Sequence, residues 1–168
     1  KILGDYDDDK KVLEKKHREF FQTYVEKGIA EGRLDKRMAE KFDLKEIART
    51  LDVNRDEFFL YAGLSGLLNR YAIKNAKQEP LETPQYFFMR VACGLCDTAA
   101  EAIELYGLLS AFEYMPSTPT LFNAGTKHPQ MSSCYLLDSP VDDLEEIYKK
   151  YTDVALLSKF SGGIGIAY

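Results

Sequence analysis

The sequence predicts a mainly helical region over residues 1–114, followed by the start of an α/β fold over residues 115–168. Apolar residues recur at helical spacing among charged ones through most of the first part, and capping residues mark where helices begin. Helix-breaking prolines and glycines cluster just after Met115. Beyond them, a strand-like run, an acid-led helix and a second strand-like run follow in the order of a β-α-β unit.

Four helix-like stretches precede the middle of the chain. Gly28 and Gly32 weaken the end of the first stretch. Asp43 stands directly before the third stretch and is expected to cap it. The fourth stretch is richest in apolar residues and is predicted to be a buried helix. The four predicted helices span residues 11–31, 34–42, 44–51 and 58–71.

Two further helices carry strong start signals. In "LETPQYFFMRVACGLC", Thr83 stands where an N-cap is expected, and Pro84 occupies the first helical position. In "DTAAEAIELYGLLSAF", Thr98 and Glu101 have the spacing of a capping box ahead of an apolar stripe. Both helices are therefore predicted to begin at defined residues.

The last third predicts a strand at 131–137, a helix, and a second strand at 164–168. Ser139 is expected to cap this helix, with Pro140 at its first position and acidic residues in its first turns. The helix is predicted to end near Phe160. The residues expected to break any helix before the first strand are Pro116, Pro119, Gly125 and Pro129.

Composition excludes several classes of protein. Of the 168 residues, 45% are hydrophobic and 29% charged, which suffices for a core, and the net charge of −5 argues against a nucleic-acid polymer as partner. No apolar run approaches the roughly 20 residues of a membrane-spanning helix. Three cysteines without a secretory signal indicate the thiols of a cytoplasmic protein. Because the sequence starts without Met and ends in a strand-like run, we expect a fragment or a split-gene product.

The "CGLC" motif from Cys93 to Cys96 matches the spacing of a thiol redox site. Such sites lie at helix N-termini, where the dipole lowers the thiol pKa. Here the motif follows about ten helical residues. It is therefore expected near a helix C-terminus, with raised pKa values, and a packing role is favoured. A zinc site would need two more ligands, and His17 and His128 are far apart in the sequence.

The glycines of "SGGIGIAY" allow two interpretations. A phosphate-binding loop is excluded, because these glycines follow a helix and precede a strand. A C-cap at Gly162 or Gly163 is favoured from composition. The alternative is close approach of a ligand to backbone that has no side chain.

Neither the acidic residues nor Cys134 define a function by residue type alone. The acids at 142–146 are expected to be a capped, solvated helix start, with a hydroxyl-accepting or metal-linked site as the alternative. An isolated cysteine such as Cys134 is more often a small buried apolar residue than a reactive group.

The order of four motifs resembles the large catalytic subunit of ribonucleotide reductase. These are "MPSTPTLFNAGT", "MSSCYLL", the acid-led helix and "KFSGGIGIAY". The resemblance is strong from about Met115 to Tyr168 and weaker from about Asn54, through "LNRYAIKN". It implies a ten-stranded α/β barrel preceded by a helical region, with only the first barrel strands in this chain.

The resemblance also implies the chemistry and the substrate site. The family replaces the ribose 2′-hydroxyl by hydrogen through a thiyl radical, and two cysteines supply the reducing electrons. Cys134 matches the first of that reducing pair. Ser133 and Thr118 match residues that contact the substrate, and Gly163 matches backbone beside it, which reverses the preference for a glycine cap.

Regulation and partners follow from the same resemblance. Asp142, Asp143 and Leu144 match the start of the helix that binds a deoxynucleoside triphosphate effector, with or without Mg²⁺, and that pairs across a homodimer. The radical is expected from a metal-containing small subunit or from adenosylcobalamin, with no cofactor or metal held by this chain itself. A thioredoxin- or glutaredoxin-type protein is the expected reductant. Diphosphate and triphosphate substrates both stay open.

The chain alone is expected to be inactive and to need the remainder of the catalytic chain, which supplies the radical cysteine and the second reducing cysteine. Two other classes stay open, a helical protein-interaction domain and a CxxC thiol redox module.

Successive strand residues point to opposite faces. Ser133 and Cys134 therefore cannot both face a substrate unless the strand ends or bulges there.

Overall fold

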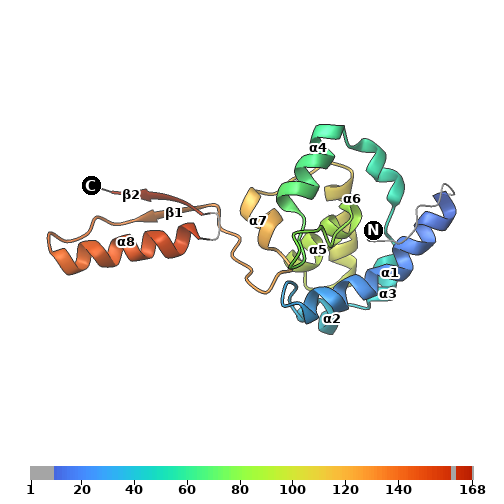
Figure 1. The fold of residues 1–168 in the computed structure, drawn as a ribbon, viewed down its shortest axis with the longest axis horizontal. Helices are drawn as coiled ribbons and strands as arrows, with labels where there is room; N and C mark the ends of the chain where they lie inside the picture. The colour runs from blue at the N-terminus through green and yellow to red at the C-terminus, as the bar shows by residue number, and fades with distance from the viewer. Residues whose placement is uncertain (1–9, 160–161, 168) are drawn as a thin grey trace.

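The computed structural model describes residues 10–159 and 162–167, which form a helical part and a strand–helix–strand unit that extends from it (Figure 1). The predicted fold class is confirmed: a mainly helical region precedes two parallel strands. Among the described residues, no helix is long and apolar enough to cross a membrane. The helical part contains α1 (Lys10–Ala30), α2 (Arg37–Lys41), α3 (Leu44–Arg49), the 3₁₀ helix η1 (Val53–Phe58), α4 (Tyr61–Gly66), the π-helical turn η2 (Leu67–Tyr71), α5 (Pro84–Leu95), α6 (Ala99–Ser110) and α7 (Thr118–Asn123).

Helix α5 forms the centre of the helical part. Every residue from Pro84 to Cys93 is buried, as expected for a helix that is apolar nearly all round. It packs against α6, while α1 packs against α3. The rings of Tyr24 in α1 and Tyr86 in α5 stack with centroids 5.0 Å apart. Tyr86 also donates a hydrogen bond to the carbonyl oxygen of His17, so α1 is fixed to α5 by both packing and a polar contact.

The predicted helix starts are confirmed at three positions. The Asp43 carboxylate accepts a hydrogen bond from the Lys45 amide at 2.9 Å and caps α3. Thr83 caps α5, with Pro84 at the first helical position. Thr98 and Glu101 form the complete capping box of α6, which satisfies amide groups that a helix start leaves without partners.

A buried ion pair lies between α5 and the chain segment that precedes it. Arg90 Nε donates to Glu82 Oε1 at 2.7 Å, and both side chains have no exposed surface. Glu82 also accepts from the Tyr24 hydroxyl at 2.5 Å and from the Ile73 amide at 2.9 Å. Arg90 donates to two α7 carbonyl oxygens, those of Leu121 and of its C-cap residue at 124, so one pair connects α1, the 73–82 segment, α5 and α7.

The predicted buried helix at 58–71 is wrong. The 3₁₀ helix η1 ends at Phe58, two extended residues follow, and only then do α4 and the π-helical turn η2 form. Leu60 and Tyr61 are 82% and 88% exposed. Gly63 and Gly66 lower helix propensity in this stretch, and its apolar residues do not keep to one face, so most of α4 does not reach the core.

Three other boundaries differ from the prediction. The helix expected at 34–42 is reduced to α2 at 37–41. Pro119 does not break a helix; it lies in the first turn of α7, where its missing amide costs no hydrogen bond. The last helix, α8 (Leu144–Ser158), is capped by Asp143 rather than by Ser139, whose hydroxyl donates instead to the Ala167 carbonyl oxygen. Its predicted end at Phe160 lies outside the described residues.

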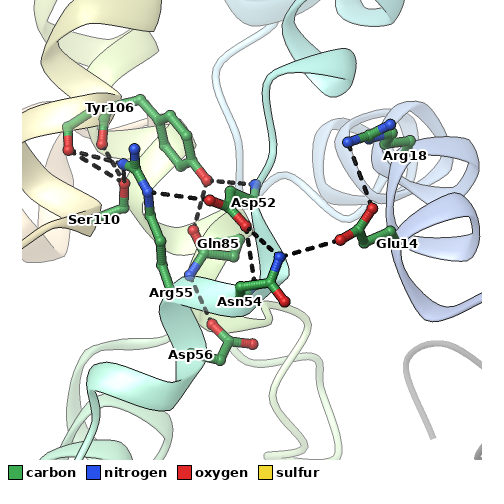
Figure 2. A network of polar contacts seen from close by, with 10 residues as sticks. Glu14, Arg18, Asp52, Asn54, Arg55, Asp56, Gln85, Tyr106 and Ser110 are labelled. Carbon is green, nitrogen blue, oxygen red and sulfur yellow. Dashed lines mark hydrogen bonds and ion pairs between the residues drawn. The ribbon is translucent and has the colours of Figure 1, made fainter. Parts of the chain in front are cut away.

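A half-buried polar network joins η1 to α5 and α6 (Figure 2). The Tyr106 hydroxyl accepts from the Asp52 amide at 2.9 Å and donates to Gln85 Oε1 at 2.6 Å. Gln85 Nε2 in turn donates to Asp56 Oδ1 at 2.6 Å. Arg55 donates to the Gly107 carbonyl oxygen and contacts Ser110. Burial raises the pKa of Asp56 to about 6, even though the Gln85 amide favours its charged form.

We predict that Asp56→Asn stabilises the fold at neutral pH. Because the pKa of Asp56 is raised above its unfolded value of 3.8, the folded chain binds this proton more tightly, and stability falls as pH rises from about 4 to about 6. Asn keeps an acceptor oxygen for Gln85 and carries no charge. Urea unfolding should show a gain of about 1–2 kcal/mol at pH 7 and a much smaller gain at pH 4. An equal gain at both pH values would contradict the assignment.

Candidate functional site

The strand–helix–strand unit carries most of the predicted site residues. Strands β1 (Cys134–Leu137) and β2 (Gly163–Ile166) are parallel and lie side by side, with α8 as the crossover between them (Figure 1). The register pairs Cys134 with Gly163 at one end and Leu137 with Ile166 at the other. Residues separated by more than twenty positions in sequence are thereby placed next to each other.

The two faces of this strand pair differ. Side chains alternate between faces along a strand, so four residues share each face. The half-buried face carries Tyr135, Leu137, Ile164 and Ile166, and α8, which contacts β2, has half-buried residues such as Ile147 and Val154. The other face is exposed and carries Cys134, Leu136, Gly163 and Gly165.

Cys134 lies directly beside backbone without a side chain. A β-carbon placed on Gly163 would be 3.7 Å from the Cys134 sulfur, an ordinary contact distance. The Gly163 amide donates to the Ser133 carbonyl oxygen at 2.7 Å. Gly163 therefore begins β2 and is not the helix cap that composition favours. A thiol on an exposed face next to bare backbone leaves room for a ligand to reach both.

Ser133 lies just before β1 and is exposed. Since the strand begins at Cys134, regular alternation does not fix the direction of the Ser133 hydroxyl.

Thr118 lies apart from these residues, as the first residue of α7 in the helical part. Its Oγ1 is 3.4 Å from the hydroxyl of Tyr71. Residues 124–133 form the segment that connects α7 to β1, and two hydrogen bonds hold this connecting segment against α7. Thr120 Oγ1 donates to the Met131 carbonyl oxygen, and Asn123 Nδ2 donates to the Gln130 carbonyl oxygen. Ser133 follows Met131 by two residues, a reach of at most about 7 Å, so α7 and the start of β1 are neighbouring structures.

The predicted effector residues lie at the other end of the unit, after the C-terminal end of β1. Asp143 is the N-cap of α8 and accepts hydrogen bonds from the Glu145 and Glu146 amides at 3.0 and 3.2 Å. Its carboxylate is therefore already used to cap the helix. Asp142 and Leu144 are exposed, and Asp142 is the carboxylate better placed to meet a ligand.

Helix α8 presents an apolar stripe to solvent. The stripe consists of Leu144, Tyr148, Tyr151 and Ala155, spaced three or four residues apart and therefore on one side of the helix. Leu144 is 69% exposed and Tyr148 is 65% exposed. The residues that pack against the strands lie on a different side. The described residues leave this stripe uncovered.

The "CGLC" motif lies at the C-terminal end of α5, as predicted. Burial raises the pKa of Cys93 to about 12, and burial together with Glu101 raises the pKa of Cys96. Both thiols thus resist forming the reactive thiolate. Gly94 has a packing role, because a β-carbon there would be 2.1 Å from the Gly125 amide nitrogen. This arrangement favours packing over a redox module.

The structure thus brings Ser133, Cys134 and Gly163 together. Helix α7 is held against the chain segment that leads to them. Sequence reasoning missed Gly165, which shares the exposed face, although the Gly-x-Gly spacing on a strand predicts it. It also did not predict the contact between Tyr71 and Thr118. Within the described residues, no group of three or more His, Cys, Asp or Glu side chains could hold a metal ion.

Comparison with known proteins finds two family models and several relatives. The all-alpha domain of ribonucleotide reductase matches residues 57–129, and the barrel domain of ribonucleotide reductase matches residues 132–168. The alpha subunits of ribonucleoside-diphosphate reductase from Chlamydia trachomatis and Helicobacter pylori are 46% and 43% identical, over 91% and 88% of this chain. The large subunit from Plasmodium falciparum is 42% identical over 73% of it. The chain spans 15%, 19% and 15% of the length of these three relatives.

We predict that Asp143→Ala loosens the start of α8. Loss of this N-cap should cost about 1 kcal/mol, and exchange of the Glu145 and Glu146 amides with deuterium should accelerate about five-fold. Asp142→Ala removes the same charge one residue earlier without removing the cap, and serves as the matched control. Equal acceleration in both variants would show that charge, not capping, stabilises this helix start.

Proposed function

This chain belongs to the ribonucleotide reductase large-subunit family, and we propose on that premise that it contributes part of the active site of an enzyme that reduces ribonucleotides to deoxyribonucleotides. The supporting observation is the pairing of Cys134 with Gly163 on the exposed face of the two strands. A thiol there can reach a sugar that lies against the bare backbone. The proposal needs the remainder of the catalytic chain, since two strands do not enclose a barrel.

The role proposed for Cys134 is that of a reducing thiol. Two thiols lose two hydrogens and form one disulfide, while the ribose 2′-hydroxyl leaves as water and hydrogen takes its place at that carbon. Cys134 supplies one of the two thiols, and a cysteine elsewhere in the catalytic chain supplies the other. A disulfide needs Cα atoms within about 7 Å, which neighbouring barrel strands can provide.

The proposed substrate is a ribonucleoside diphosphate, because the similar proteins carry that substrate in their names. Thr118 and Ser133 offer hydroxyl groups that can donate to phosphate or ribose oxygens. Gly163 allows the nucleotide to approach the strand backbone. The hydrogen bonds between α7 and the connecting segment support this assignment, because they keep Thr118 and Ser133 in one neighbourhood.

Helix α8 is proposed to bind the effector and to pair with a second copy of the chain. Asp142 would accept a hydrogen bond from a sugar hydroxyl of a deoxynucleoside triphosphate, next to the exposed Leu144. Bare carboxylates repel phosphates, so a bound Mg²⁺ suits the effector. The exposed stripe of Leu144, Tyr148 and Tyr151 offers apolar area and aromatic anchors for the dimer.

The remaining partners are proposed from family membership. The radical that starts the reaction comes from outside this chain, either from a metal-containing small subunit or from adenosylcobalamin. A thioredoxin- or glutaredoxin-type protein restores the thiols. A cytoplasmic setting suits this chemistry, since it keeps cysteines reduced, and the described cysteines are all free thiols.

We predict that Cys134→Ser abolishes turnover but not substrate binding in the complete enzyme. Serine keeps the size of the side chain and removes the electron source, so multiple-turnover activity with a dithiol should fall more than about 100-fold. Cys96→Ser is the control and should keep activity, because Cys96 lies at the end of α5. After a single turnover, mass spectrometry should find Cys134 of the wild-type enzyme in a disulfide. A free Cys134 thiol at that point would refute the assignment.

We predict that Asp142→Ala weakens effector binding in the complete enzyme. Loss of a charge-assisted hydrogen bond should raise the dissociation constant for the deoxynucleoside triphosphate about ten-fold or more. Glu145→Gln, in the first turn of the same helix, should change it less than about two-fold. Isothermal titration calorimetry measures both constants. The same constant for Asp142→Ala and wild type would place the effector elsewhere.

A further inference from the structure

We propose that Tyr71 is a positioning residue of the substrate site, which aligns the Thr118 hydroxyl for a phosphate group of the ribonucleotide. The inference rests on the proposed function in taking Thr118 as a phosphate contact. Tyr71 comes from the π-helical turn η2, and Thr118 begins α7. Their hydroxyl oxygens are 3.4 Å apart.

The Tyr71 ring is held along one side of α7. It stacks on Phe122, with ring centroids 4.8 Å apart and planes inclined by only 18°. Thr118 and Phe122 are four residues apart in α7 and therefore lie one above the other on the same side of the helix. One aromatic side chain thus spans a full turn, with its ring on Phe122 and its hydroxyl at Thr118.

The chemistry of the two hydroxyl groups explains why this contact matters. Threonine has one proton to donate, and an ionised phosphate oxygen can only accept. When Tyr71 donates to Thr118 Oγ1, the threonine proton is left for the phosphate. A hydroxyl that accepts one hydrogen bond is also a better donor in the next, because the bonds polarise each other. Tyr71 thereby fixes both the direction and the strength of the Thr118 donor.

The backbone around Tyr71 forms a rare kind of turn. The Ala72 amide donates to the Leu67 carbonyl oxygen at 2.8 Å, the wider bond of a π-helical turn. Such turns are rare and occur often at functional sites. Lys74 donates to the Asn69 carbonyl oxygen at 2.6 Å and supports the turn. The guanidinium of Arg70 lies 5.7 Å from the centre of the Tyr71 ring and places a positive charge beside it.

The test is Tyr71→Phe in the complete enzyme. Phenylalanine keeps the ring that stacks on Phe122 and removes only the hydroxyl, so the fold is retained. The KM for a ribonucleoside diphosphate should rise about three- to ten-fold, the loss expected for one hydrogen bond, while kcat at saturation stays within about two-fold. Tyr61→Phe is the matched control, because Tyr61 is almost fully exposed in α4 and should leave both constants unchanged.

A double-mutant cycle separates this inference from the proposed function. Thr118→Val alone should raise KM, and Tyr71→Phe should add nothing further in the Thr118→Val background. If Thr118→Val leaves KM unchanged, the phosphate role of Thr118 fails. If Thr118→Val raises KM but Tyr71→Phe does not, only the inference about Tyr71 fails. Additive effects of the two changes would likewise overturn it, because Tyr71 would then not act through Thr118.

Discussion

The buried pair of Arg90 and Glu82 is the interaction on which the rest of the helical part depends. Each partner without the other would be an unpaired charge with no exposed surface, which no fold tolerates at low cost. Arg90 uses its planar group to reach Glu82 and two carbonyl oxygens at the end of α7 at once. Burial, and after it the Glu82 charge, raises the pKa of the Tyr24 phenol, so this group stays a neutral donor to Glu82. Through its bonds to the end of α7, Arg90 of this pair helps to fix the position of that helix and therefore of Thr118.

Close approach of backbone at the end of α5 completes that arrangement. Gly94 has no side chain, and the backbone at Gly125 passes directly over it. Gly125 itself has a φ of 73°, which a residue with a side chain rarely adopts, and its carbonyl oxygen accepts from the Asp35 amide. The glycine of "CGLC" and the glycine of "FNAGT" thus belong to a single packing contact. The motif therefore has a packing role at the end of α5, and burial raises the pKa of both of its thiols.

Several helix caps could be predicted from the sequence, whereas contacts between distant residues could not. Thr83, Thr98 and Asp43 were predictable as caps because a cap depends on a few adjacent residues. The start of α8 was not, since Ser139 and Asp143 both suit a cap and the bond from Ser139 to Ala167 joins distant residues. In the candidate site, Cys134 and Gly163 were found only by resemblance, and the fold then placed them side by side. No pattern in the sequence predicts the contact of Tyr71 with Thr118, because packing between helices creates it.

The candidate site residues come from both the helical part and the strand–helix–strand unit. Thr118 belongs to the helical part, whereas Cys134 and Gly163 belong to the strand pair. A nucleotide that contacts all three must therefore bridge the parts through its phosphates and its ribose. The bonds from Thr120 to Met131 and from Asn123 to Gln130 restrict how far the parts can separate. Pre-organisation of this kind lowers the entropy that binding must remove, so in the proposed site α7 would act as a structural support.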